Sequence, residues 1–174
     1  EVMYTRALMY YTNGLKYNFP TNTNFKNEIK RCYDLLEIIV SKHPNSYGGA
    51  MAHDLMISIK QPSLQISTEK VVVPNQPFKS LIEYNNIQTL FYRIYKLSSV
   101  ELRELSSGGN WTEKMKTISK KKLQTASGIK LPQDTDLRSH KTEIAFNGLA
   151  VGNYMIVCSP DSNFTNNKSL IYAL

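Results

Sequence analysis

Cysteine is scarce in this sequence. Two of the 174 residues are cysteine, Cys32 and Cys158, which is too few for a disulfide framework or a cysteine-rich zinc site. No apolar run approaches the roughly 18 residues that a membrane span needs. Eight glycines and seven prolines are too few for a collagenous or disordered chain. These absences leave a chain that folds around a real core, either as one domain or as a small domain with an appendage.

Catalytic signatures are also missing. The histidines are His43, His53 and His140, and none of them lies in a His-Glu-x-x-His motif. The sequence has no Gly-x-Ser-x-Gly string and no phosphate-binding Gly-x-x-x-x-Gly-Lys loop. His53 and Asp54 are adjacent, so on a helix their side chains diverge by about 100° and do not act on one substrate atom. We predict a protein that is not an enzyme, with no catalytic residue, no cofactor and no metal site. A hydrolase whose acid and base meet only in the folded chain is the remaining enzymatic alternative.

Residues 1–61 carry helical periodicity, which stops near Pro62. Apolar positions three and four residues apart predict helices over about residues 3–13, 25–40 and 46–59. Thr23 or Asn24 is the expected cap of the second helix, and Ser46 of the third. The stripe of the second helix includes Cys32, which we interpret as a small buried hydrophobic residue, as we do Cys158 in a later strand.

From Pro62 onward, apolar residues recur at every second position, which is typical of half-buried strands. The pattern predicts strands over residues 64–69, 78–84, 87–97, 141–146, 154–158 and 169–174. Turns at spacings of about 8 to 12 residues indicate a sandwich rather than a parallel sheet. Its predicted core is Leu64, Ile66, Ile82, Tyr92, Ile94, Ile144, Phe146, Tyr154 and Ile156. The predicted fold class is therefore α+β, with a helical segment over residues 1–61 followed by an antiparallel β-sandwich over residues 62–174.

A helical insertion is predicted to interrupt the sandwich at about residues 98–127. Ser98 or Ser99 caps its first, short helix, and a second helix runs from Trp111 to about residue 125. We expect Trp111 to anchor the insertion to the sandwich.

The insertion holds most of the net charge. Lysine and arginine number 21 against 14 acidic residues, a net charge of +7. Five lysines make up a candidate patch for an anionic ligand: Lys114, Lys116, Lys120, Lys121 and Lys122. The other interpretation, which we favour, is a solvated helix face, because the aromatic residues and arginines that stack on bases and grip phosphates are missing between these lysines. We predict no nucleic-acid partner.

Two stretches of the sequence contain unusual strings. Residues 43–98 read HPNSYGGAMAHDLMISIKQPSLQISTEKVVVPNQPFKSLIEYNNIQTLFYRIYKLS, and residues 131–164 read LPQDTDLRSHKTEIAFNGLAVGNYMIVCSPDSNF. The most specific strings are Pro-Asn-x-Pro-Phe at residues 74–78 and His-x-Thr-Glu-Ile at residues 140–144. Both stretches resemble the amino-terminal region of the large alpha-2-macroglobulin family proteins of Bacteroidetes-type bacteria. The resemblance implies a tetratricopeptide-like helical lead-in and a macroglobulin-type, fibronectin-like sandwich.

The same resemblance implies a large exported protein, periplasmic or associated with the cell envelope, that meets a membrane only through an anchor in the parent chain. No signal-peptide pattern follows Glu1, so we expect any signal peptide to lie outside this sequence. The thioester string of the family, Cys-Gly-Glu-Gln, has no match, because Tyr33 follows Cys32 and Ser159 follows Cys158.

The expected function is a non-enzymatic structural and interaction module of such a protein, whose parent traps proteases. Its expected partners are the other domains of the parent chain and proteases. The alternative function is a polysaccharide- or surface-binding sandwich that uses the lysine-rich insertion.

Overall fold

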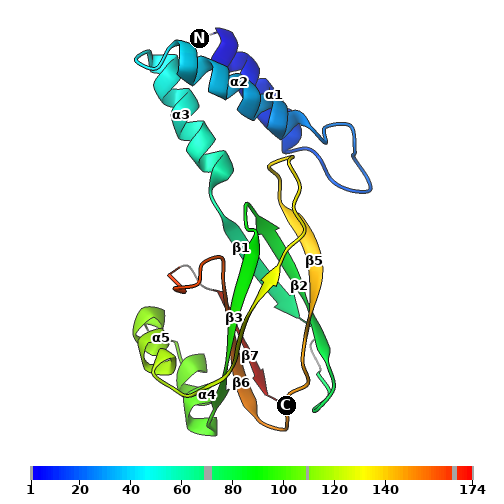
Figure 1. Ribbon diagram of the computed structural model, residues 1–174, viewed down its shortest axis with the longest axis vertical. Coiled ribbons are helices and arrows are strands. Elements are labelled where there is room, and N and C mark those ends of the chain that lie inside the picture. The colour runs from blue at the N-terminus through cyan, green and yellow to red at the C-terminus, as the bar shows by residue number, and fades with distance from the viewer. Residues whose placement is uncertain (1, 69–71, 109, 166–167, 174) are drawn as a thin grey trace. The chain divides into compact units, whose positions relative to one another are not determined.

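The computed structural model describes residues 2–68, 72–108, 110–165 and 168–173. Its helices are α1 (Val2–Gly14), α2 (Glu28–Lys42), α3 (Tyr47–Lys60), α4 (Ser99–Ser106) and α5 (Trp111–Ser119). Its strands are β1 (Ser63–Thr68), β2 (Phe78–Asn85), β3 (Thr89–Leu97), β4 (Leu123–Lys130), β5 (His140–Phe146), β6 (Asn153–Ser159) and β7 (Lys168–Ala173). The chain divides into two compact units, Glu1–Pro62 with Gln133–Ser139, and Ser63–Pro132 with His140–Leu174 (Figure 1).

Helices α1, α2 and α3 form the first unit, because each buries an apolar stripe against its neighbour. Their common core is Ala7, Ile29, Cys32, Tyr33, Leu36, Ile39, Ala52 and Ile59. The prediction that Ser46 caps the third helix is confirmed, since its hydroxyl accepts a 3.0 Å hydrogen bond from the Gly49 amide. Gly49 also permits the turn between α2 and α3, where a Cβ would lie 2.1 Å from the carbonyl oxygen of His43.

Helix α2 begins three residues later than predicted and uses neither of the predicted caps. It begins at Glu28 after Asn27, whose side chain makes no cap hydrogen bond. The preceding residues are held in a loop by two backbone hydrogen bonds between Asn18 and Asn22, of 2.9 and 2.6 Å. Because the loop continues in turns up to Asn27, neither Thr23 nor Asn24 reaches the cap position.

Residues Gln133–Ser139, which connect β4 to β5, belong to the helical unit. Leu137 packs against the helical core, and the Arg138 guanidinium lies over the ring of Tyr17, 3.7 Å from its centroid. Arg138 also donates to Asp136 at 2.6 and 3.0 Å, in a pair whose side chains are 11% and 5% exposed. The sequence of this stretch has no periodic pattern that assigns it to the helices.

In the described residues, the second unit contains the helices α4 and α5 and two antiparallel sheets, one ordered β1-β2-β5 and the other β4-β3-β6-β7. The first, second and fifth strands thus face the fourth, third, sixth and seventh, which makes an antiparallel sandwich of the same general architecture as fibronectin type III domains. Strands β1 and β7 lie next to each other where the two sheets meet. The predicted α+β fold class, with an antiparallel sandwich, is confirmed.

The sandwich core lies between these sheets. It contains every residue predicted for it, with Ile66 and Tyr92 half-buried at its margin and Tyr154 and Ile156 fully buried. Alternation places these side chains correctly, because successive residues of a strand point to opposite faces of the sheet.

Candidate functional site: the lysine-rich insertion

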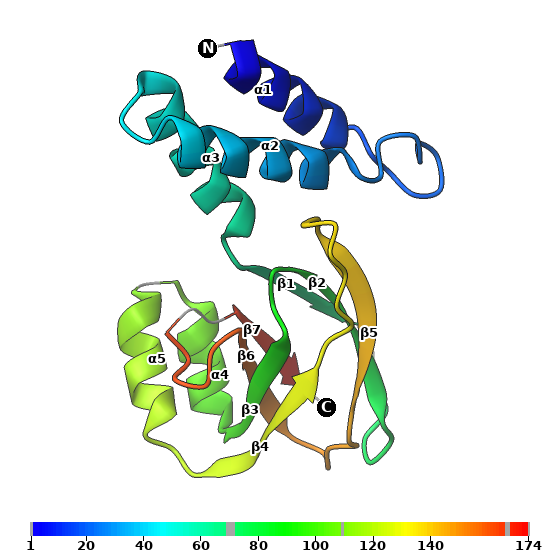
Figure 2. The same cartoon turned by 45° about the horizontal axis from the view of Figure 1, so that its top comes forward.

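Helices α4 and α5 connect β3 to β4 and cover the outer face of the four-stranded sheet (Figure 2). The contact is a second apolar cluster, separate from the sandwich core, formed by Tyr95, Leu97, Leu105, Ile118, Met155 and Val157. Met115 packs against it. The side chain of Trp111, the expected anchor, lies outside the described residues. Leu105, Met115 and Ile118 therefore make the described contacts between insertion and sheet.

The second helix of the insertion is shorter than predicted. Helix α5 ends at Ser119, and the chain from Leu123 onward forms β4 instead of continuing the helix to residue 125. Strand β4 pairs with β3, with Tyr95 opposite Leu123 and Ile94 opposite Thr125. A ladder with a neighbouring strand overrides the helical spacing of Ile118 and Leu123, since helical periodicity alone is a weak preference.

Helix α4 begins with a reciprocal cap. The Ser98 hydroxyl accepts from the Glu101 amide at 3.3 Å, and the Glu101 carboxylate accepts from the Ser98 amide at 2.8 Å. Lys121 forms an ion pair with the same carboxylate. The amide and the hydroxyl of Ser98 both donate to this carboxylate. The hydrogen bond from Lys121, followed by these two from Ser98, lowers the pKa of Glu101 from its ordinary 4.5 to about 2. One of the five predicted patch lysines is thus paired with an acidic residue on the neighbouring helix.

Lys114 holds the other end of α4. Its ammonium donates to the carbonyl oxygens of Glu104, Leu105 and Gly108, at the end of the helix and just beyond it, the bond to Leu105 being 3.3 Å. The last carbonyls of a helix have no intrahelical donor and carry partial negative charge, so an ammonium stabilises them. Lys114 therefore contributes to the packing of α4 against α5.

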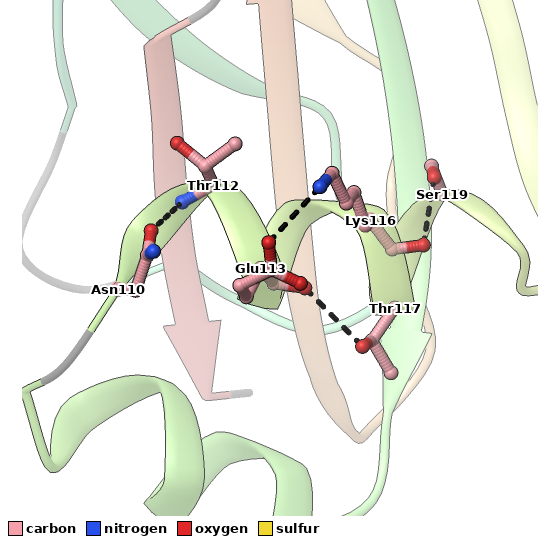
Figure 3. A network of polar contacts seen from close by, with 6 residues as sticks. All are labelled: Asn110, Thr112, Glu113, Lys116, Thr117 and Ser119. Atoms are coloured by element: carbon pink, nitrogen blue, oxygen red, sulfur yellow. Dashed lines mark hydrogen bonds and ion pairs between the residues drawn. The ribbon is translucent and has the colours of Figure 1, made fainter.

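Lys116 belongs to a local network on α5 (Figure 3). It donates to Glu113 at 2.9 Å, and both side chains are about two-thirds exposed, at 66% and 64%. The Asn110 side chain caps the helix by accepting from the Thr112 amide at 3.0 Å. Thr117 and Ser119 donate to the carbonyl oxygens of Glu113 and Lys116, respectively. Because the pair is exposed, its ion-pair energy is small and screened by salt.

Lys120 and Lys122 are the exposed remainder of the predicted patch. Between Lys114 and Gln133 the sequence contains no acidic residue, and Lys130 adds a further exposed cation. The positive surface therefore lies at the junction of α5 and β4, and it attracts anions in a salt-dependent manner. The anionic-ligand patch of five lysines stays a prediction. Three of the five, Lys114, Lys116 and Lys121, already bind carbonyl or carboxylate groups within the insertion.

The other residues considered from the sequence lie on other elements: His53 on α3, His140 on β5, Cys32 on α2 and Cys158 on β6. His53 Nδ1 is 3.9 Å from Asp54 Oδ1, and both side chains are exposed. The His140 ring lies 6.1 Å from that of Tyr84. Cys32 and Cys158 are buried, as predicted, and both are free thiols. Burial raises the thiol pKa of Cys32 to about 11 and that of Cys158 to about 12.

Sequence reasoning missed two parts of this region. It did not predict Glu101 as the partner of Lys121, because the two residues meet only when α4 and the end of α5 are both in place. It also missed β4, although Thr125 and Ile129 are β-branched residues that sequence analysis could have weighed as a strand signal.

No protein-family model matches the chain, and no curated protein matches it in sequence. Among solved structures, the chain is similar to the CARDB domain of a Pyrococcus furiosus protein, determined in complex with di-metal ions. The sequence identity is 12% and the TM-score 0.35, over 65% of this chain and 86% of that one. A similarity this low carries no argument about fold or function. In the part of the chain that is described, no helix has both the length and the apolar character of a membrane span.

Proposed function

We propose that this chain is a non-enzymatic structural and interaction module of an exported alpha-2-macroglobulin-like protein. The observation that carries the proposal is the strand order, β1-β2-β5 facing β4-β3-β6-β7, which is the fibronectin-like arrangement that the sequence resemblance implies. The module packs against neighbouring domains of the same parent chain, and the parent engages proteases.

The chemistry of the two thiols supports a role without covalent catalysis. The thiolate is the reactive form of cysteine, and burial keeps both thiols protonated at neutral pH. Cys32 lies in the helical core and Cys158 in the sandwich core, where each acts as a small apolar residue. Neither is placed to form a thioester or to attack a substrate.

The first experiment is a peptidase assay. A general protease is titrated with the folded chain, the residual peptidase activity is measured, and the mixture is analysed by intact-mass spectrometry. We expect no inhibition and no covalent adduct, because the chain supplies a scaffold and not a trap. Stoichiometric inhibition would overturn the non-enzymatic, non-trapping role.

The second experiment tests the module's partners. The domains encoded beside this chain in its reading frame are expressed and mixed with it, and complex formation is followed by light scattering after size exclusion. We expect a neighbouring domain of macroglobulin type to bind the chain. A reading frame that encodes no such domain would refute the family assignment and with it the proposed parent.

A polysaccharide- or surface-binding sandwich is the second candidate, favoured by the exposed ammonium groups of Lys120 and Lys122. The test is retention on a heparin column as a function of salt. If this function holds, Lys120→Gln/Lys122→Gln elutes at clearly lower salt than the matched double variant Lys26→Gln/Lys42→Gln, which removes the same charge from exposed positions of the helical unit. Equal elution of the two variants would reject the patch.

A further inference from the structure

Strand β4 is an edge strand whose outer side is unpaired among the described strands. It pairs with β3 and with no other described strand, because it is the first strand in the order β4-β3-β6-β7. The residues of β4 are exposed except Thr125 and Ile129, which are half-buried. Such an edge offers a row of backbone donors and acceptors that a further extended chain can pair with.

One hydrogen bond identifies which backbone groups point outward. The Leu131 amide donates to the Gln88 carbonyl at 3.0 Å, so the backbone of Leu131 faces β3. Amide and carbonyl groups alternate in direction along an antiparallel strand. The regular register from Thr89 opposite Lys130 to Arg93 opposite Ala126 therefore directs the backbone groups of Ala126, Gly128 and Lys130 away from β3.

The devices that usually block an edge are weak here. Strand β4 contains no proline, and its register shift lies near its start, between the partners Ile94 and Tyr95. The pairing from Thr125 to Lys130 is continuous. Lysine is the remaining protective device, since a charged side chain on an edge discourages pairing with another copy of the same edge.

The charge around β4 has one sign. Lys120 and Lys122 precede the strand, Lys130 ends it, and all three are exposed. The edge strand of the other sheet, β5, differs, because its Lys141 and Glu143 each form an ion pair with a residue of β2. The positive charge at the β4 edge therefore complements the negative charge of an acidic partner.

We propose that the β4 edge binds an extended acidic peptide segment as an added strand. Main-chain hydrogen bonds from Ala126, Gly128 and Lys130 hold the segment, and the flanking lysines select acidic side chains at its ends. The inference rests on the interaction role proposed above and assigns to it one surface and one class of partner.

The probe is a synthetic twelve-residue peptide in which valine alternates with threonine in the middle and glutamate occupies both ends. Amide hydrogen exchange of the full chain is measured by NMR with and without the peptide. We expect new protection at the Ala126, Gly128 and Lys130 amides, and unchanged exchange at Ser127 and Ile129, whose amides already face β3. Affinity should fall as salt is raised.

Two variants separate backbone pairing from charge. Gly128→Pro removes one outward amide, which an edge strand tolerates, and should abolish peptide binding while thermal unfolding stays cooperative. Lys120→Gln/Lys122→Gln keeps the backbone intact and should weaken binding about tenfold, since each exposed charge pair contributes modestly. The matched variant Lys26→Gln/Lys42→Gln should bind like the unmodified chain.

Absence of binding, or binding without new protection at the three outward amides, would overturn the proposal. The second result would indicate a surface that holds any polyanion, and a heparin oligosaccharide of equal charge would then compete with the peptide. Equal affinity for a peptide with glutamine in place of glutamate would also overturn it. Each of these results leaves the peptidase assay and the binding of neighbouring domains unaffected, so failure here is distinguishable from failure of the proposed function.

Discussion

The phenolic hydroxyl of Tyr84, at the end of β2, donates a 2.7 Å hydrogen bond to the carbonyl oxygen of Pro132, 48 residues away in the chain. Tyr84 is 4% exposed, and Pro132 is the last residue of the sandwich before the chain enters the helical unit at Gln133. The bond therefore fixes the point at which the chain leaves the sandwich after β4.

Replacing Tyr84 by phenylalanine should lower the free energy of unfolding of the sandwich by about 1 kcal/mol, the net value of a buried hydrogen bond. Tyr154→Phe is the matched control, because the buried Tyr154 hydroxyl has no hydrogen-bond partner among the described residues, and its loss should cost nothing. Urea unfolding followed by fluorescence of Trp111, the sole tryptophan, measures both. An equal cost for the two variants would contradict the assignment.

Gly148→Ala should destabilise the sandwich by about 1 to 3 kcal/mol. An added Cβ would lie 2.5 Å from the carbonyl carbon of Asn75 and 2.7 Å from the amide nitrogen of Gln76, and backbone atoms cannot rotate away. The Asn75 amide also donates to the Leu149 carbonyl at 2.7 Å across the same contact. Differential scanning calorimetry gives the change in melting temperature.

Gly128→Ala provides the contrast to Gly148→Ala. The nearest atoms to its added Cβ belong to the side chains of Thr89 and Phe91, at 3.3 and 3.4 Å. Because these side chains can adjust, and because alanine reduces the entropy of the unfolded chain, the change should stay within about 0.5 kcal/mol. A large loss of stability in Gly128→Ala, together with no loss in Gly148→Ala, would contradict both predictions.

The capping box of α4 predicts a dependence on pH. The Glu101 pKa is lowered from 4.5 to about 2, so its contribution to stability is complete above about pH 4.5 and is lost as the pH falls toward 2. Glu101→Gln retains the cap geometry but loses the charge. Its stability deficit relative to the unmodified chain should be present at pH 7 and vanish near pH 2.

The neutral part of the cap is tested separately. Ser98→Ala removes the hydroxyl that accepts from the Glu101 amide and should cost about 1 kcal/mol at pH 7. The measurement is urea unfolding at pH values from 7 to 2. A deficit of Glu101→Gln that is constant across this range would show that the carboxylate charge is not involved.

Both thiols should resist alkylation in the folded chain. Burial raises their pKa values to about 11 and about 12, which keeps the reactive thiolate scarce at pH 8. Iodoacetamide labelling, followed by mass spectrometry of tryptic peptides, should be slow for Cys32, slower for Cys158, and fast for both in urea. Rapid labelling of Cys158 in the folded chain would contradict its position in the sandwich core.

Local features of the fold could be predicted because neighbouring residues determine them. Ser46 and Ser98 occupy their cap positions, and Leu64, Ile82, Ile144 and Phe146 face the core, since capping depends on the next few amides and strand alternation on each residue's own position. The end of α5 could not be predicted in the same way, because the strand that follows forms only where β3 is present to pair with it.

The candidate site was predictable in composition and not in arrangement. The run of lysines is visible in the sequence. The engagement of Lys114 with the end of α4 and of Lys121 with Glu101 depends on two helices packed together on one sheet. These contacts change how many of the five cations remain available to a ligand.

By itself, the sequence determined that helices precede strands, that strand residues such as Leu64, Ile82 and Phe146 face the sandwich core, and that positive charge gathers after Trp111. The tertiary structure alone decided that β4 is an edge, that Gln133–Ser139 belongs with the helices, and which lysines face solvent. The reason is physical. Periodicity and capping act over a few residues, whereas strand pairing and ion pairing between elements require segments far apart in the chain to meet.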